Sequence, residues 1–170
     1  MKVLDESGLV RGLRLAYGYA PRGERVYDKA PAGKGKRLNL LGWVGLDGKG
    51  CLAAHAGSVN AEVFTCFVKK RLLSRLKPGD IVVWDNHKIH YNAAAKEMIE
   101  QRGATIKFLP RYSPDYNPIE MLWSKLKHYV KKARADTFAA LEPAVKAALG
   151  MITISDVRGW YEHCGFNTSM

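Results

Sequence analysis

One aspartate follows a short apolar run near the middle of the chain, in a position where a carboxylate can do chemistry. Asp85 comes directly after Ile81-Val82-Val83-Trp84, and an unbroken apolar run of this length predicts a strand that is buried on both faces. The carboxylate would then emerge at the carboxyl edge of a central strand, where open α/β sheets bind ligands. The alternative is a turn-forming aspartate, assisted by Asn86.

Two further acids occupy chemically informative positions. Asp5 follows the apolar Val3 and Leu4 in an expected first strand, where a buried carboxylate is costly unless something pairs with it. Asp5 could equally face solvent. Glu120 stands three residues after Asn117, at the start of an expected long helix. That is the spacing of a capping box, so a purely structural role for Glu120 is also open.

Together, carboxylates from two strands and one helix start could bind hard divalent cations. Mg²⁺ prefers oxygen ligands, and phosphate-cutting sites often hold two metal ions about 3.5–4 Å apart. One ion can activate the attacking oxygen while the other stabilises the leaving oxygen. We therefore predict that Asp5, Asp85 and Glu120 converge on a common metal site.

The charge of the chain indicates a polyanionic partner. Lys and Arg number 27 against 16 acids, which gives a formal net charge of +11, and nucleic acid is the usual partner of so basic a domain. Many of the cations lie in a loop over residues 20–37, which is rich in Gly and Pro. Others lie on the expected helix over residues 118–134, where a solvated helix face and phosphate contact are both open. Charge alone does not separate a nuclease from a passive binder.

Length and composition bound the class of protein. The 170 residues suit one continuous domain, 1–170, and no run approaches the roughly 18 apolar residues that span a membrane. We expect a cytoplasmic protein without a membrane partner, because the N-terminal residues reach an acid too early for a signal peptide. Cys51, Cys66 and Cys164 are odd in number and widely spaced, which favours reduced, mostly buried thiols over a zinc site or disulfides.

Patterning predicts hairpin strands first and alternating strands and helices afterwards. The residue types favour a mixed sheet with helices packed on its faces. The first expected strand covers residues 2–10, and residues 13–19 form its hairpin partner. Further strands are expected over residues 38–46, 50–58, 81–84 and 105–109. The expected helices cover residues 60–76, 91–102 and 118–134, followed by two helices in the tail, the first of uncertain extent because of Pro143.

Whole blocks of sequence add a second kind of evidence. The most specific block is Ser113-Pro114-Asp115-Tyr116-Asn117-Pro118-Ile119-Glu120, and 34 residues separate Asp85 from Glu120. This block and this spacing resemble those of the mariner-type DDE transposases and, more narrowly, of their bacterial insertion-sequence branch. Asp5-Glu6-Ser7-Gly8, Tyr19-Ala20-Pro21-Arg22-Gly23 and the terminal Tyr161-Glu162-His163-Cys164-Gly165-Phe166 are also similar to family segments. The resemblance implies an α/β, ribonuclease H-like fold with a mixed five-stranded sheet and helices on both faces.

The resemblance also implies a function. Asp5, Asp85 and Glu120 would bind two Mg²⁺ or Mn²⁺ ions and catalyse DNA strand cleavage followed by strand transfer. Expected partners are DNA, both element ends and target, and a second copy of the chain in a homodimer, on the nucleoid of a bacterial cytoplasm. Full-length relatives carry N-terminal helix-turn-helix modules, which we expect to be absent here, so activity of this chain by itself is an open question.

The expected DNA contacts come from the loop, the Asp85 motif and the long helix. His90 matches the family motif as a supporting residue, and His87 suits a plain hydrogen-bonding role. The candidates for nucleic-acid binding are Arg22, Lys34, Lys36, Arg37, His90, Arg111, Lys125 and Lys127. Two alternatives to a transposase remain at this point: a related ribonuclease H-like nuclease, and a catalytically inactive remnant that acts as a DNA-binding module.

Overall fold

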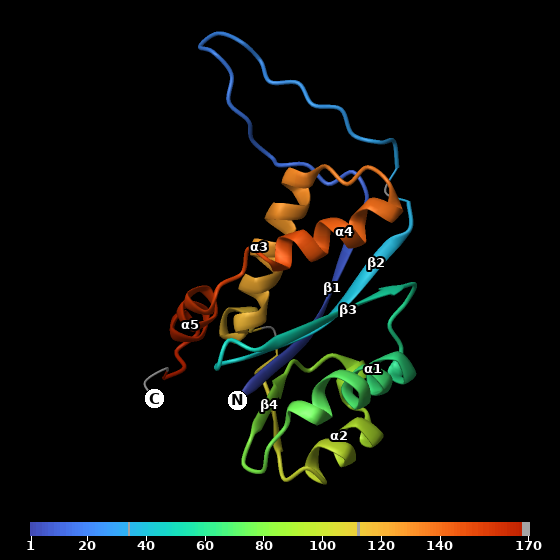
Figure 1. The fold of residues 1–170 in the computed structure, drawn as a ribbon, viewed down its shortest axis with the longest axis vertical. Coiled ribbons are helices and arrows are strands. Elements are labelled where there is room, and N and C mark those ends of the chain that lie inside the picture. Colours follow the sequence, from blue (N-terminus) through green and yellow to red (C-terminus); the bar gives the residue numbers. More distant parts are fainter. Residues whose placement is uncertain (34, 112, 168–170) are drawn as a thin grey trace.

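A mixed five-stranded sheet forms the centre of the molecule. The computed structural model describes residues 1–33, 35–111 and 113–167, and its strands are ordered β3-β2-β1-β4-β5 (Figure 1). β1 pairs antiparallel with β2 and parallel with β4, while β2–β3 is antiparallel and β4–β5 is parallel. The strands are β1 Lys2–Val10, β2 Arg37–Gly45, β3 Gly50–Ala56, β4 Ile81–Trp84 and β5 Thr105–Phe108. The expected mixed sheet is confirmed.

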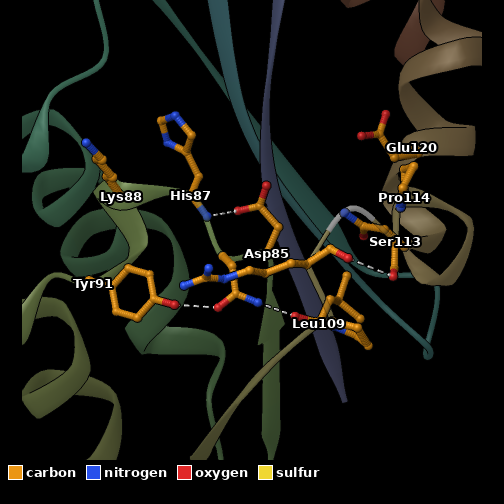
Figure 2. Close-up of a pocket in the computed structure, with 12 residues that line it drawn as sticks. Asp85, His87, Lys88, Tyr91, Leu109, Ser113, Pro114 and Glu120 are labelled. Carbon is orange, nitrogen blue, oxygen red and sulfur yellow. Dashed lines mark hydrogen bonds between the residues drawn. The ribbon is translucent and has the colours of Figure 1, made fainter.

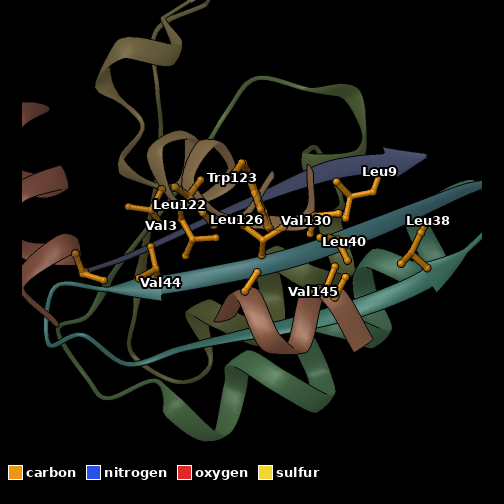
Figure 3. Packing of buried hydrophobic residues seen from close by; sticks show 14 of the residues in the cluster. Val3, Leu9, Leu38, Leu40, Val44, Leu122, Trp123, Leu126, Val130 and Val145 are labelled. Carbon is orange, nitrogen blue, oxygen red and sulfur yellow. The ribbon is translucent and has the colours of Figure 1, made fainter. Parts of the chain in front are cut away.

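Helices cover both faces of this sheet, as expected. On one face, α3 and α4 pack over Val3, Leu40 and other apolar residues (Figure 3). On the other face, α1 and α2 pack over Leu4 and its neighbours. The helices are α1 Ala61–Phe67, α2 Ala93–Glu100, α3 Pro118–Ala133, α4 Phe138–Leu149 and α5 Ile154–His163.

Strand β1 serves both layers because successive side chains of a strand point to opposite faces. Val3 and Leu9 belong to the core cluster beneath α3, whereas Leu4 belongs to the cluster beneath α1 and α2. The same alternation places Asp5 on the α3 side and Glu6 on the opposite side. The two acids of one dipeptide therefore face different layers.

The hairpin expected between residues 2–10 and 13–19 is wrong. β1 pairs along its whole length with β2, from Lys2 opposite Gly45 to Val10 opposite Arg37. The described chain between them, residues 11–33 and 35–36, leaves the sheet as a long arm (Figure 1). At its root the backbone N–H of Gly12, at φ +72°, donates to the backbone oxygen of Ala135, two residues after the end of α3. That contact directs the chain toward α3 and away from a tight turn.

Ion pairs attach the root of the arm to the end of α3. Arg14 pairs with Asp136 at 2.7 Å and with Asp28 at 3.3 Å, and Arg134 pairs with Asp28 at 3.1 Å. Farther out, Tyr17 and Tyr19 are fully exposed. An alternating pattern with no buried face does not make a strand, which explains the failed hairpin prediction.

Other elements match the expected ones with local differences. The helix expected over residues 60–76 starts with the predicted Asn60 cap but continues as a π-helical turn, Val68–Leu72, and a 3₁₀ turn, Leu73–Arg75. Pro143 lies inside α4 and does not end it.

The three cysteines are free, but of the three only Cys164 is buried, so the expectation of mostly buried thiols is wrong. No single helix among the described residues is long and apolar enough to cross a membrane, and α4 with α5 meets that test only as a pair bent by 85°.

Candidate active site

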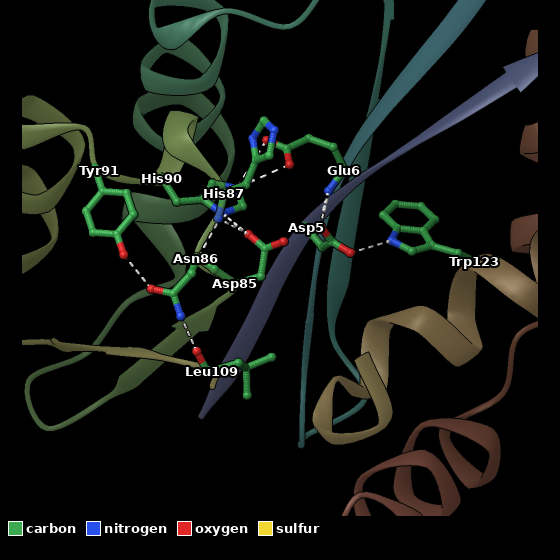
Figure 4. Close-up of polar contacts among 9 residues, drawn as sticks. All are labelled: Asp5, Glu6, Asp85, Asn86, His87, His90, Tyr91, Leu109 and Trp123. Carbon is green, nitrogen blue, oxygen red and sulfur yellow. Dashed lines mark hydrogen bonds and ion pairs between the residues drawn. The ribbon is translucent and has the colours of Figure 1, made fainter. Parts of the chain in front are cut away.

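Asp5 lies in the middle of β1 and is nearly enclosed. It is 7% exposed; its Oδ1 accepts from the backbone N–H of Glu6 at 2.7 Å, and its Oδ2 accepts from the indole Nε1 of Trp123 at 3.3 Å (Figure 4). Opposite Asp5 on β2 is Gly42, where a Cβ atom would lie 2.7 Å from the Trp123 ring. The absence of a side chain at Gly42 therefore lets Trp123 approach the sheet beside Asp5.

Burial makes the Asp5 carboxyl a much weaker acid than an ordinary aspartate. Desolvation raises its pKa from 3.8 to about 7, against the lowering effect of the Glu6 N–H. The negative charges of Glu120, Glu6 and Asp85 raise the pKa further. A buried carboxylate surrounded by three others is costly unless a cation compensates the charge.

Asp85 follows the last residue of β4, as predicted, and is held by two donors. Its Oδ1 accepts from the backbone N–H of His87 at 2.9 Å and contacts Nδ1 of His90 at 2.5 Å (Figure 4). Partial burial would raise the pKa of Asp85, but these hydrogen bonds outweigh it and hold the pKa below its usual range. No described residue hydrogen-bonds to Oδ2, so this oxygen remains available to a ligand.

Glu120 lies in the first turn of α3 and is exposed. The capping-box alternative is wrong, because Asn117 makes no side-chain cap and its Oδ1 is buried without a partner among the described residues. The Glu120 N–H bonds instead to the backbone oxygen of Asn117 at 3.0 Å. The partial positive charge of a helix N-terminus favours a carboxylate there.

The three acids lie around one part of the sheet edge. Val3 is opposite Val83 in the parallel β1–β4 pair. Continuing that register by two residues brings Asp5 level with Asp85 on strands that lie about 4.8 Å apart. Asp85 and Glu120 line the same cavity, of about 490 Å³ (Figure 2). Asp5 is not in its wall but is close enough for both charges to raise its pKa.

The donor set suits a hard divalent cation, although its side chains do not form a closed cage. Within residues 1–33, 35–111 and 113–167, no three His, Cys, Asp or Glu side chains are arranged to hold an ion as they stand. Carboxylates that repel one another favour rotamers that keep them apart. The three acids supply the oxygen ligands that Mg²⁺ and Mn²⁺ prefer, and the common metal site stays a prediction.

His90 is not the DNA contact that we expected. The residue is 1% exposed and its ring stacks on the Trp84 ring. It lies between Asp85 and Glu6, whose Oε2 is 3.1 Å from Nε2 (Figure 4). Burial would lower the pKa of His90, but the two carboxylates outweigh it and raise the pKa to about 10. A charged imidazolium with both nitrogens engaged inside the fold cannot reach DNA. Its contacts make it a positioning residue for Asp85.

This contact gives a testable expectation. We expect Glu6→Gln and His90→Asn to weaken Mn²⁺ binding about 10- to 100-fold, because outer residues that orient a metal ligand typically contribute that much. The measurement is calorimetric titration of the chain with Mn²⁺. His163→Asn, which changes an exposed histidine on α5, is the control. Mn²⁺ affinity unchanged in both Glu6→Gln and His90→Asn would contradict a positioning role.

The remaining candidates for DNA contact are divided by their surroundings. Arg22 and Lys36 are exposed on the arm, Arg37 is exposed at the start of β2, and Lys34 lies outside the described residues. Arg111 is exposed and lines the cavity. Lys127 is partly exposed on α3.

Lys125 was expected to contact DNA, but the structure pairs it with an acid of another helix. Its Nζ lies 2.6 Å from Asp156 Oδ2, and both side chains are partly exposed. It ties α3 to α5 and is not free for phosphate.

The roles of Glu6 and Trp123 were not anticipated from the sequence. Alternation along β1 next to Asp5 was the one available signal for Glu6.

Comparison with known proteins identifies the family. A family model described as DDE superfamily endonuclease matches residues 1–142. The chain belongs to the DDE endonuclease superfamily. A search of curated protein sequences finds no significant match.

Solved structures show the same fold. A Mos1 mariner paired-end complex with Mg has a TM-score of 0.75 and 18% identity, over 96% of this chain and 53% of that one. A Mos1 paired-end complex with the left transposon end has a TM-score of 0.73 and 19% identity, over 95% of this chain and 51% of that one. The catalytic domain of Mos1 has a TM-score of 0.66 and 16% identity, over 95% of this chain and 74% of that one. This DDE domain thus has the expected ribonuclease H-like fold and spans about half the length of the chains in the two complexes.

Proposed function

We propose that this DDE domain is the catalytic domain of a transposase that cleaves DNA at the ends of a mobile element and joins them to target DNA. The observation that carries the proposal is the buried Asp5 carboxyl, whose pKa is raised to about 7 by burial and by Glu120, Glu6 and Asp85. Such a group suits a site built to bind cations. The fold shared with Mos1 paired-end complexes, one with Mg and one with Mn, supports the proposal.

Asp5, Asp85 and Glu120 would hold two Mg²⁺ or Mn²⁺ ions. Such ions would activate the attacking oxygen and stabilise the leaving oxygen of a phosphodiester. The chain itself contributes positioning: Trp123 orients Asp5, and His90 with the His87 amide fixes one oxygen of Asp85 so that the other is available. Fixed ligands reduce the reorganisation needed when charge develops in the transition state.

DNA would enter through the cavity beside these acids. Lys88 and Arg111 line its wall with Asp85 and Glu120, and their cations suit phosphate oxygens on either side of the cleaved bond. Arg22, Lys36 and Arg37 would contact DNA farther out, and Lys127 along α3. The net charge of +11 supports such contacts.

Finer assignments belong to the same proposal. The Ser113–Glu120 block favours the bacterial insertion-sequence branch of the mariner-type superfamily. The paired-end complexes of Mos1 favour a homodimer in the active complex. We further propose that residues 1–170 act as one catalytic domain in the cytoplasm, on the nucleoid when bound to DNA.

Nicking of supercoiled plasmid tests the proposal without knowledge of the element ends. We expect the purified chain to convert supercoiled plasmid into relaxed circles in Mg²⁺ or Mn²⁺, and not when a chelator is present, because the carboxylates need cations to bring a phosphodiester close. Gel electrophoresis measures the product. Equal nicking in chelator would contradict metal-dependent cleavage, and cutting of RNA in hybrids but not of DNA would point to the related nuclease.

A further inference from the structure

Two exposed aromatic rings stack on each other beside the cavity. Tyr91 is 59% exposed and Phe108 is 40% exposed, with ring centroids 5.0 Å apart and planes 14° from parallel. Neither ring belongs to a core cluster. Tyr91 lines the same cavity as Asp85 and Glu120 (Figure 2). Large flat apolar surface is thus presented next to the acids.

The Tyr91 ring is fixed before any ligand arrives. Its hydroxyl donates to Oδ1 of Asn86, and the Asn86 amide donates in turn to the Leu109 backbone oxygen (Figure 4). Phe108, the last residue of β5, also packs against the buried Trp84 ring at 5.9 Å. A ring held in place loses little conformational entropy when a ligand stacks on it.

The charges of the cavity wall indicate the kind of ligand. Lys88 and Arg111 lie in the wall with Tyr91, so the site combines cations for phosphate with a flat apolar ring. Nucleobases stack on aromatic side chains whatever their sequence, provided that they are not paired inside a duplex. A nucleotide in an unpaired strand carries both of the matching features.

We propose that Tyr91 and Phe108 form a stacking platform for an unpaired nucleobase of the DNA strand whose phosphate lies at the acids. The platform rests on the proposed function, because it assumes that DNA occupies this cavity. It would hold the strand beside the reacting phosphate through a base that has left the duplex, independently of base identity.

The test is a double-mutant cycle between ring and base. Binding of the full chain is measured by fluorescence anisotropy in Ca²⁺, a divalent ion that takes oxygen ligands, for a short thymidylate strand and for an abasic strand of equal length and charge. We expect Tyr91→Leu to weaken binding of the thymidylate strand about tenfold, the effect of losing one base–aromatic stack. The abasic strand should bind the variant and the wild type equally, since it has no base to stack.

Controls separate stacking from other effects. Tyr91→Phe keeps the ring but loses the hydroxyl that fixes it, so it should weaken binding of the thymidylate strand much less than Tyr91→Leu and leave the abasic strand unaffected. Phe108→Leu should repeat the loss on the thymidylate strand. Tyr116→Leu alters a ring of similar exposure, 55%, that does not line the cavity, and should change nothing. Equal losses on both strands, or none on the thymidylate strand, would overturn the platform.

The two proposals can fail separately. If plasmid nicking is absent but the cycle shows coupling, the platform stands and the cleavage assignment falls. If nicking is present and Tyr91→Leu binds the thymidylate strand normally, the cleavage assignment stands and the platform falls.

Discussion

Glu120→Gln is expected to abolish metal-dependent nicking while leaving the thermal stability of the domain almost unchanged. Glu120 is exposed and makes no side-chain hydrogen bond with a described residue, and no capping box involves it. Its structural contribution is therefore limited to the charge–dipole term of a helix N-terminus, about 0.3–1 kcal/mol. As a metal ligand, however, it supplies a full negative charge. Nicking should fall by more than the roughly 10- to 100-fold cost of losing an outer positioning residue.

Glu62→Gln provides the matched control. Glu62 is an exposed acid in the first turn of another helix, α1, so the substitution removes the same dipole interaction without touching the acid cluster. Both variants are compared by plasmid nicking and by thermal melting. If Glu120→Gln melts normally and still nicks DNA at the wild-type rate, the third ligand lies elsewhere.

Asp5→Asn is expected to remove a large pH dependence of stability from the metal-free domain. The pKa of Asp5 is raised from 3.8 to about 7 in the folded chain. Between these values the folded state keeps a proton that the unfolded state has lost, so the free energy of unfolding decreases as pH rises. The decrease amounts to at most about 4 kcal/mol. Asn does not ionise, so the variant should lack it and gain in stability relative to the wild type from pH 4 to pH 8.

Urea unfolding at a series of pH values measures this difference. Asp5 accepts from the Glu6 N–H and from the Trp123 indole on separate oxygens, and Asn offers only one acceptor oxygen. The lost hydrogen bond adds a constant cost, so the slope of the free energy of unfolding with pH is the informative quantity. His90 changes stability between its ordinary pKa of 6.5 and about 10, equally in both proteins, and cancels in the comparison. Mg²⁺ should stabilise the wild type more at pH 8 than at pH 5, and the variant much less. Parallel pH curves for the two proteins would show that Asp5 is not a desolvated carboxyl.

Local patterns predicted the parts of the site that depend on neighbours in sequence. The apolar run before Asp85 identified β4, and Pro118 identified the start of α3, because strand burial and helix initiation leave short signatures. The family blocks linked these elements to Asp5. Each of the three acids lies in the element, or at the element end, expected for it.

The failures concern contacts between distant residues. Residues 13–19 of the arm were taken for a strand because alternation is local, whereas the pairing of β1 with β2 joins residues up to 43 positions apart, from Lys2 to Gly45. His90 was taken for a DNA contact because nothing near it in sequence reveals that Glu6, 84 residues away, is its second partner. Asn117 has the spacing of a cap, but its buried side chain does not reach the helix amides.

The two-faced character of β1 restricts how the gene of such a domain can change in length. Asp5 and Glu6 face opposite layers, so an insertion or deletion of one residue before them would exchange the two acids and invert every apolar side chain of the strand. The arm, by contrast, leaves the sheet after Val10 and returns at Arg37, so residues can be gained or lost there without shifting either strand. We therefore expect changes in length to be tolerated in the arm, whereas β1 tolerates only substitution.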